Sequence, residues 1–91
     1  MGYFMPMPFW VDKMELRGNY DVYVEFNDGR KGVIDFRNKL TTDHREIIRE
    51  LIDMDKFKTV KIERHTLCWD NGVDFAPEYL YDQVMAAKKV A

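Results

Sequence analysis

Apolar and polar residues alternate along two stretches near the start of the chain, which is typical of half-buried β-strands. Residues 20–26 alternate most regularly, and residues 10–16 follow the same period. Gly18 and Asn19 separate the two stretches and form a typical turn pair. Keeping the apolar side chains on one face predicts a three-residue loop, with Leu16 opposite Tyr20 and Met14 opposite Val22.

A third strand, ending at Phe36, follows a turn that ends at Gly29. A three-residue loop places Val22 opposite Ile34 and keeps the apolar face intact, whereas a shift by one residue turns every side chain to the wrong face. Gly29 suits the left-handed position of such a turn. One unfavourable pair remains, because Asp21 then faces Asp35. Residues 10–36 therefore predict an antiparallel three-stranded meander.

The middle of the chain changes to a helical period. Residues 41–55 place Ile47, Ile48, Leu51 and Ile52 on one stripe, as in a helix with one buried face. Asp43 is the expected N-cap, with Glu46 completing a capping box.

Residues 58–81 predict a second meander and a final helix. We expect a strand over 58–63 with Val60 and Ile62 inward, and Ile62 opposite Leu67. The turn Asp70-Asn71-Gly72 places Trp69 near Val73 and Leu67 near Phe75. Pro77 suits the first position of a helix whose buried stripe is Leu80, Val84 and Ala87. The fold class is α+β, with two antiparallel β-meanders (βββ-α-βββ-α) and two helices packed on the sheet.

Length and charge narrow the range of functions. The chain has 91 residues with 14 Lys and Arg, 16 Asp and Glu, and a net charge of −2. This predicts a single α+β domain over residues 10–91, preceded by an aromatic and proline-containing arm over residues 1–9. Oppositely charged residues are interleaved, so we interpret a sequence cluster of basic residues as a solvated surface and do not expect a nucleic-acid partner; the cluster is Arg45, Arg49, Lys56, Lys58, Lys61 and Arg64.

The arm and the single cysteine bear on location. The amino terminus is apolar but has no basic leader and is interrupted by Pro6 and Pro8, unlike a signal peptide. Cys68 is the only cysteine, so no internal disulfide can form. We find no apolar run of membrane-spanning length and expect a cytoplasmic protein without a membrane partner.

Several segments together resemble a bacterial family called domain of unknown function 2442. They are the hairpin segment 24–29, residues 33–36 and 57–60, and above all Trp69-Asp70-Asn71-Gly72-Val73-Asp74-Phe75-Ala76-Pro77-Glu78-Tyr79-Leu80-Tyr81. The resemblance covers roughly residues 10–82. Asp70 departs from it, standing where the family commonly has Pro, and the arm is not part of the pattern.

The resemblance implies no activity. It implies a small protein often encoded beside another small protein, as in a toxin–antitoxin-like pair. One member is fused to a helix-turn-helix DNA-binding domain, and some members are labelled as nitrite- or sulphite-reductase subunits. This chain has neither a helix-turn-helix pattern nor four cysteines for a cluster, so neither property transfers to its residues.

Candidate catalytic groups have simpler structural explanations. His65 and Cys68 lie three residues apart beside a strand, so their side chains point to opposite faces and do not form a metal site. The chain contains no serine, which excludes a serine triad. Four acidic residues near the end could serve acid–base chemistry, but turn and helix-start roles account for them; they are Asp70, Asp74, Glu78 and Asp82. We therefore predict no catalytic, cofactor-binding or metal-binding residues and no cofactor.

Aromatic residues suggest binding instead. Exposed aromatic side chains mark interaction surfaces, and we predict a non-catalytic protein-interaction module that binds a protein partner or itself. The family resemblance implies an antitoxin-like role as its specific form. The candidate contact residues are Trp69, Tyr79, Tyr81, Tyr23, Phe4 and Phe9. Two alternatives stay open: an enzyme or redox-accessory subunit using the acidic residues, and a nucleic-acid-associated regulator.

Overall fold

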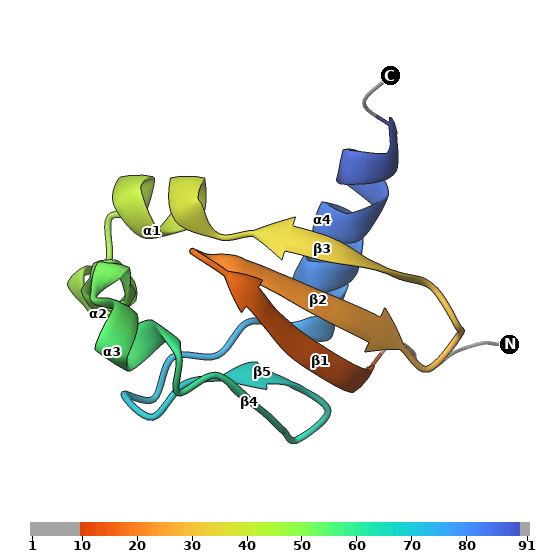
Figure 1. Cartoon of the computed structure of the whole chain (residues 1–91), viewed down its shortest axis with the longest axis horizontal. Helices are drawn as coiled ribbons and strands as arrows, with labels where there is room; N and C mark the ends of the chain where they lie inside the picture. Colours follow the sequence, from red (N-terminus) through yellow and green to blue (C-terminus); the bar gives the residue numbers. More distant parts are fainter. Residues whose placement is uncertain (1–9, 90–91) are drawn as a thin grey trace, which may run out of the picture.

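Three antiparallel strands form the first half of the fold, in the order β1-β2-β3 (Figure 1). They are β1 (Val11–Gly18), β2 (Asp21–Phe26) and β3 (Lys31–Asp35). The computed structural model describes the backbone of residues 10–89 and the side chains of residues 10–87. Phe4 and Phe9, with the rest of the arm, lie outside the described residues.

The predicted β2–β3 register is confirmed. Val22 pairs with Ile34 and Asp21 faces Asp35. Gly29 has a φ of +91°, and its N–H donates to the carbonyl of Phe26 over 2.9 Å. The left-handed turn position therefore belongs to glycine, as its lack of a Cβ allows.

The predicted β1–β2 register is wrong by two residues. Leu16 pairs with Val22 and Met14 with Val24, and only Asn19 and Tyr20 separate the paired ends of the strands. The register shifts between Leu16 and Gly18, which is the mark of a β-bulge. Met14 and Leu16 keep their predicted face although their partners differ. A second shift, between Val11 and Lys13, turns Val11 into the core and leaves Trp10 exposed, so the face expected from the alternation of residues 10–16 is wrong at these two residues.

The predicted helix over residues 41–55 is wrong. Four short elements replace it: α1 (Arg37–Thr42), α2 (Glu46–Arg49), the 3₁₀ turn η1 (Glu50–Ile52) and α3 (Met54–Phe57). Asp43 and Asp53 are extended, with ψ of 141° and 114°, and separate the helices. Each carboxylate accepts the backbone N–H two residues later, at Arg45 and Asp55. Such bonds compete with helical ones, and Arg45, not Asp43, is the N-cap of α2.

The second meander is shorter than predicted. β4 (Lys61–Glu63) pairs with β5 (Thr66–Cys68) in the predicted register, with Ile62 opposite Leu67. An isolated bridge between Cys68 and Asp74 stands where a third strand was expected. Ile62 is 37% exposed, so its predicted inward orientation is wrong, because this two-stranded sheet leaves it at the surface.

The turn after Trp69 and the final helix follow the prediction. Trp69 donates its N–H to Val73 over 2.9 Å, and Phe75 donates to Leu67 over 3.4 Å. α4 (Pro77–Lys89) begins at Pro77. Leu80 and Val84 are buried, but Ala87 is exposed because it lies near the end of the helix, beyond the core.

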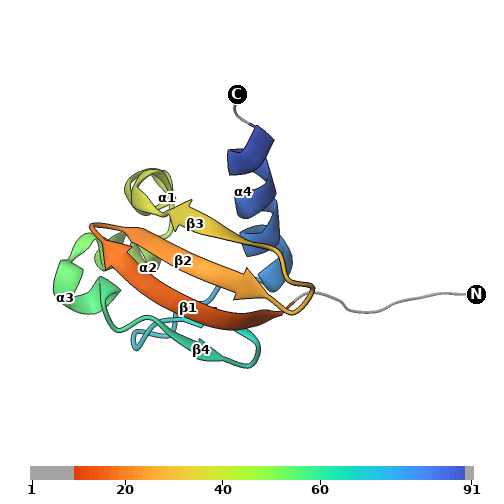
Figure 2. The ribbon, with the colours of Figure 1, turned by 45° about the vertical axis from the view of Figure 1, so that its right-hand side comes forward.

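α4 crosses the core face of the three-stranded sheet and extends past β3 (Figures 1 and 2). The close approach depends on Gly32, because a Cβ there would lie 2.9 Å from Cγ1 of Val84. On the other side of the core, Phe36 packs against Phe57, Trp69 and Phe75 at ring centroid distances of 5.6–6.0 Å. The α+β class is confirmed. Among residues 10–89, we find no helix long and apolar enough to cross a membrane.

Candidate functional site

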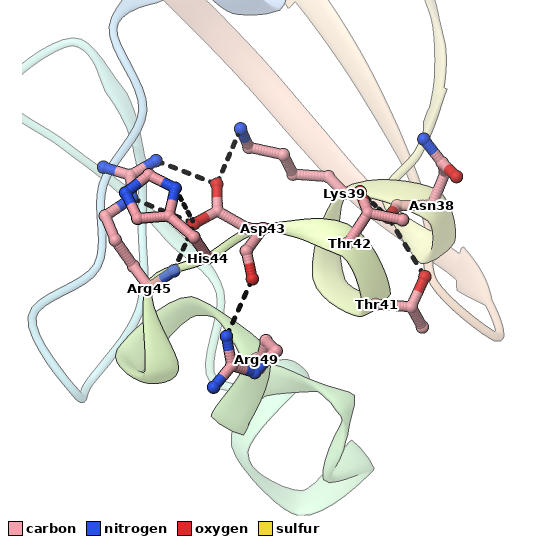
Figure 3. Close-up of polar contacts among 8 residues, drawn as sticks. All are labelled: Asn38, Lys39, Thr41, Thr42, Asp43, His44, Arg45 and Arg49. Carbon is pink, nitrogen blue, oxygen red and sulfur yellow. Dashed lines mark hydrogen bonds and ion pairs between the residues drawn. The ribbon is translucent and has the colours of Figure 1, made fainter.

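A buried carboxylate joins α1 to α2 (Figure 3). The side chain of Asp43 is 3% exposed and lies 2.8 Å from Nζ of Lys39. Two guanidinium nitrogens of Arg45 donate to its two oxygens over 3.0 Å each, and the Arg45 backbone N–H donates over 2.8 Å. Arg49 donates to the Asp43 carbonyl over 2.9 Å.

This arrangement holds Asp43 as an anion. Hydrogen bonds from Arg45 and Lys39 keep the pKa of the Asp43 carboxyl far below its usual range. A carboxyl group whose pKa is lowered in this way has no proton to donate near neutral pH and is a poor base, so it does not suit acid–base catalysis. We interpret the cluster as the structural joint between two short helices.

Tyr81 ties α4 to the turn between β2 and β3. Its hydroxyl donates to Oδ2 of Asp28 over 3.0 Å and accepts a hydrogen bond from Arg30. Its ring packs edge-on against Phe26 at 5.1 Å, and the residue is 8% exposed. The hydrogen bond from the Arg30 backbone, followed by that from Tyr81, lowers the pKa of the Asp28 carboxyl.

The other aromatic candidates are divided between the core and the surface. Trp69 is 2% exposed, and its Nε1–H donates to the Phe57 carbonyl over 2.8 Å, because the indole lies among the core aromatic rings. Tyr79 is half-buried, with its ring stacked on Phe75 at 5.3 Å. Tyr23 lies on the outer face of the three-stranded sheet, with the Arg17 guanidinium 4.5 Å from its ring centroid.

The acidic candidates are spread over separate places. Asp70 pairs with Lys61 over 3.1 Å, and Asp74 lies in a hollow beside Arg45 and Val73. Glu78 and Asp82 are exposed on α4. Across the part of the chain whose side chains are described, no group of three His, Cys, Asp or Glu residues could hold a metal ion.

Cys68 is a buried thiol. Its side chain lies 3.6 Å from a carboxylate oxygen of Glu63, and burial, followed by this contact, raises the pKa of the thiol. A raised pKa disfavours the nucleophilic thiolate. His65, the other member of the candidate pair, instead packs its ring 5.3 Å from that of Trp10.

Most of the basic residues considered above have acidic or carbonyl partners. The observed pairs are Arg45 and Arg49 with Asp43, Lys56 with Glu50, Lys58 with Asp55, and Lys61 with Asp70. Each of these contacts places a carboxylate or a carbonyl oxygen beside a basic side chain.

The outer edge of β3 is a different kind of surface, because it is formed by backbone groups and not by paired side chains. β3 is the last strand of its sheet. Phe26 donates to the Arg30 carbonyl and Phe36 to that of Tyr20, which marks the even-numbered residues of β3 as those bonded to β2. The N–H and C=O groups of Lys31, Val33 and Asp35 therefore point away from the sheet.

A groove runs along this edge, between β3 and the outer half of α4. Its volume is about 300 Å³, and its lining is Val33, Ile34, Asp35, Gln83, Ala86 and Ala87. Val33 is 40% exposed, and the two alanines are small and exposed. Among residues 10–89, no backbone hydrogen bond reaches the outward groups of the β3 edge. We call this feature the β3 edge groove.

Sequence patterns alone did not identify the β3 edge groove. The alternation in residues 31–35 was visible, but the position of a strand at the edge of a sheet depends on contacts between distant segments. The local signal was Gly32, because a glycine inside a strand often marks a close approach by another element.

An α+β domain with two small antiparallel sheets, a covering helix and an open sheet edge defines the class of this protein. A family model described as "Protein of unknown function (DUF2442)" matches residues 11–86. The chain therefore belongs to that family, and the predicted resemblance is confirmed. No curated protein and no solved structure matches the chain.

Proposed function

We propose that this protein is a non-catalytic interaction module that binds an extended segment of another protein at the β3 edge groove. The observation that carries the proposal is the row of outward N–H and C=O groups on Lys31, Val33 and Asp35, which have no backbone partner among residues 10–89. Strand addition uses such groups for affinity and neighbouring pockets for specificity.

The surrounding surface supports this mode of binding. Exposed Val33 can contact an incoming strand on the outer face of the sheet, while Ala86 and Ala87 leave room beneath it. Three of the carboxylates described above, those of Asp28, Asp43 and Asp70, are occupied by structural pairs, which favours binding over catalysis. Tyr79 and the arm residues Phe4 and Phe9 stay candidate contacts, but the proposal does not depend on them.

In its specific form, the proposal is antitoxin-like: the partner is a small protein encoded beside this one. Co-expression followed by purification on a tag attached to this chain tests it. We expect the neighbouring product to co-purify in a fixed ratio, and a chain that always elutes without it would contradict the antitoxin-like role.

Substitutions at Val33 test the edge. Val33→Pro removes an outward N–H donor without removing a hydrogen bond to β2. Proline is tolerated at such positions on edge strands. Val33→Thr is the matched control, because it keeps the N–H and the β-branched shape. We expect Val33→Pro to lose the partner and Val33→Thr to retain it.

A second pair of variants covers the case in which Val33→Pro fails to fold. Ala86→Arg fills the groove at an exposed helical position, and Ala86→Ser is its small control. We expect only Ala86→Arg to weaken binding. If the partner binds equally well to folded Val33→Pro and Ala86→Arg proteins, the β3 edge groove is not its site.

A further inference from the structure

We propose that, without another partner, the β3 edge pairs with the β3 edge of a second copy of this chain, giving a two-fold symmetric dimer with a continuous six-stranded sheet. This inference rests on the proposed function, because it names an occupant of the same edge. The sequence of β3, Lys31-Gly32-Val33-Ile34-Asp35, complements itself in charge when it is read in the opposite direction.

The outward hydrogen-bonding residues fix the register. Antiparallel pairing centred on Val33 places Val33 opposite Val33 of the second copy, and Lys31 opposite Asp35 at both ends. Each of these three pairs is of the hydrogen-bonded kind, so each exchanges two N–H···O=C bonds. A register that centres on Lys31 or on Asp35 instead places like charges opposite each other and pairs fewer residues.

The charges on the outer face support the same register. Within one chain Asp35 faces Asp21, a like-charge pair, while Lys31 faces Glu25. In the dimer Lys31 of the second copy would lie on the open side of Asp35. The row across the joined sheet then reads Glu25, Lys31, Asp35, Asp21, so the two central residues form an opposite-charge pair. The Asp35 carboxylate, which accepts the Arg37 backbone N–H over 2.9 Å within one chain, thereby gains a positively charged neighbour.

In this pairing the helix beside the edge lies next to its counterpart in the second copy. A two-fold axis that relates antiparallel neighbouring strands is perpendicular to the sheet, so both copies of α4 lie on the same face of the joined sheet. The residues of α4 beside the groove include the exposed small residues Ala86 and Ala87. An isologous contact of this kind closes on itself and does not form fibres.

A five-residue edge makes a small interface, in the transient class below about 1,200 Å². Sedimentation equilibrium from low micromolar to millimolar concentration is therefore the first measurement, and we expect a reversible monomer–dimer equilibrium. A chain that stays monomeric throughout would overturn the inference.

Charge exchange tests the register. Lys31→Asp and Asp35→Lys each place like charges across the axis, and we expect each to weaken dimerisation about tenfold or more, since charge pairs of this kind decide orientation. The double exchange K31D/D35K restores opposite charges and should recover dimerisation. Circular dichroism and urea unfolding of each variant confirm that the monomer is folded. Two weakened single variants without recovery in the double variant would overturn the register.

Hydrogen exchange gives a second signature that needs no substitution. The amides of Lys31, Val33 and Asp35 should become protected as concentration rises, whereas those of Gly32 and Ile34 are protected at every concentration by β2. Dimerisation without this alternation would place the contact elsewhere and overturn the inference.

The outcomes also separate the two proposals. If the chain is monomeric but Val33→Pro abolishes binding of the neighbouring protein, the dimer is wrong and the proposed function stands. If K31D/D35K recovers a dimer but no other protein binds at this edge, the dimer stands and the proposed function is wrong. Since both occupants use the same N–H and C=O groups, a complex with the neighbouring protein should contain one copy of this chain for each bound segment.

Discussion

Substituting Gly32 tests how closely α4 is held against β3. An added Cβ would lie 2.9 Å from Cγ1 of Val84, whereas carbon atoms in good contact are about 3.5–4.0 Å apart. Gly32→Ala therefore requires a displacement of about 0.5–1 Å between a strand and a helix that share a packed core. Overpacking of this size costs about 1–3 kcal/mol.

A smaller effect has the opposite sign. Alanine reduces the conformational freedom of the unfolded chain and stabilises by about 0.4–1 kcal/mol where its backbone conformation is allowed. With each effect taken near the middle of its range, the net expectation for Gly32→Ala is a loss of about 1–2 kcal/mol. For a domain of this size, that loss lowers the Tm by about 4–16 °C.

Val84→Ala completes a double-mutant cycle. Val84 is 1% exposed, and loss of its two methyl groups with the cavity they leave costs about 2–3 kcal/mol. In the double variant the new methyl group of position 32 enters the space that Val84 vacates, so the summed losses should exceed the observed loss by about 1 kcal/mol or more. Urea unfolding measures the free energy of unfolding of each variant. An unchanged m-value shows that a shifted midpoint reports a change in stability.

Two results would refute this reasoning. Gly32→Ala could leave the free energy of unfolding unchanged, which would mean that α4 is not seated against Gly32. The two substitutions could instead be additive, which would mean that the loss at Gly32 does not come from contact with Val84. The first result would also contradict the packing of α4 against β3, which forms one wall of the β3 edge groove.

Three further predictions test other parts of the fold. Gly29→Val should lower the free energy of unfolding by about 1–3 kcal/mol, because valine is strained at a left-handed position; an unchanged stability would reject the turn geometry. Because the folded-state pKa of Asp43 is lowered, its stabilising contribution is present above its unfolded pKa of about 4 and is lost as the pH falls below that value. The difference in free energy of unfolding between wild type and Asp43→Asn, measured in urea from pH 7 to pH 2, should therefore shrink below about pH 4. A constant difference would contradict the ion cluster. Cys68 should react slowly with a thiol reagent such as Ellman's reagent at pH 8 in the folded protein and rapidly in urea, since it is buried and its pKa is raised; equal rates in both states would show that the site opens readily.

Local turn chemistry explains which parts of the fold could be predicted from sequence. The β2–β3 hairpin followed from Gly29, and the turn after Trp69 from Gly72, because each glycine fixes a loop length and each loop length fixes a register. The start of α4 followed from Pro77. In these places a few neighbouring residues determine the structure.

The predictions failed where a local sequence pattern is compatible with two different structures. Asp43 resembles a helix N-cap, but its carboxylate also bonds Arg45 and Lys39, and the extended backbone at this residue ends α1 instead of starting a long helix. In the β1–β2 hairpin the face of each residue was predicted but not its partner, because a bulge beside Gly18 changes the register without a strong sequence signal.

The site was harder to predict than the fold, because an edge exists only after the strands have been ordered. Trp69 and Tyr81 are large and aromatic and so resemble contact residues, but the fold uses both internally, one in the core and the other as a link between α4 and the β2–β3 turn. The proposed binding edge is instead made of backbone groups, which every residue carries, so no residue type predicts it.

The two edges of the three-stranded sheet support a binding role for β3. Soluble proteins protect sheet edges with bulges, proline or a covering segment, because an unprotected edge pairs with other chains. β1 shows two register shifts, and its first N–H, at Val11, donates to the His65 carbonyl over 2.8 Å. β3 has a regular register with β2 and no proline, and it places an exposed valine at the centre of its edge. A chain that protects one edge of a sheet with bulges and leaves the other regular, with an exposed valine between Lys31 and Asp35, has retained a surface that favours pairing. Like charges opposite each other destabilise a sheet, and Asp35 of β3 faces Asp21 of β2 in this way. This unfavourable pair includes a residue of the open edge, where a positive charge on an incoming strand would compensate for it.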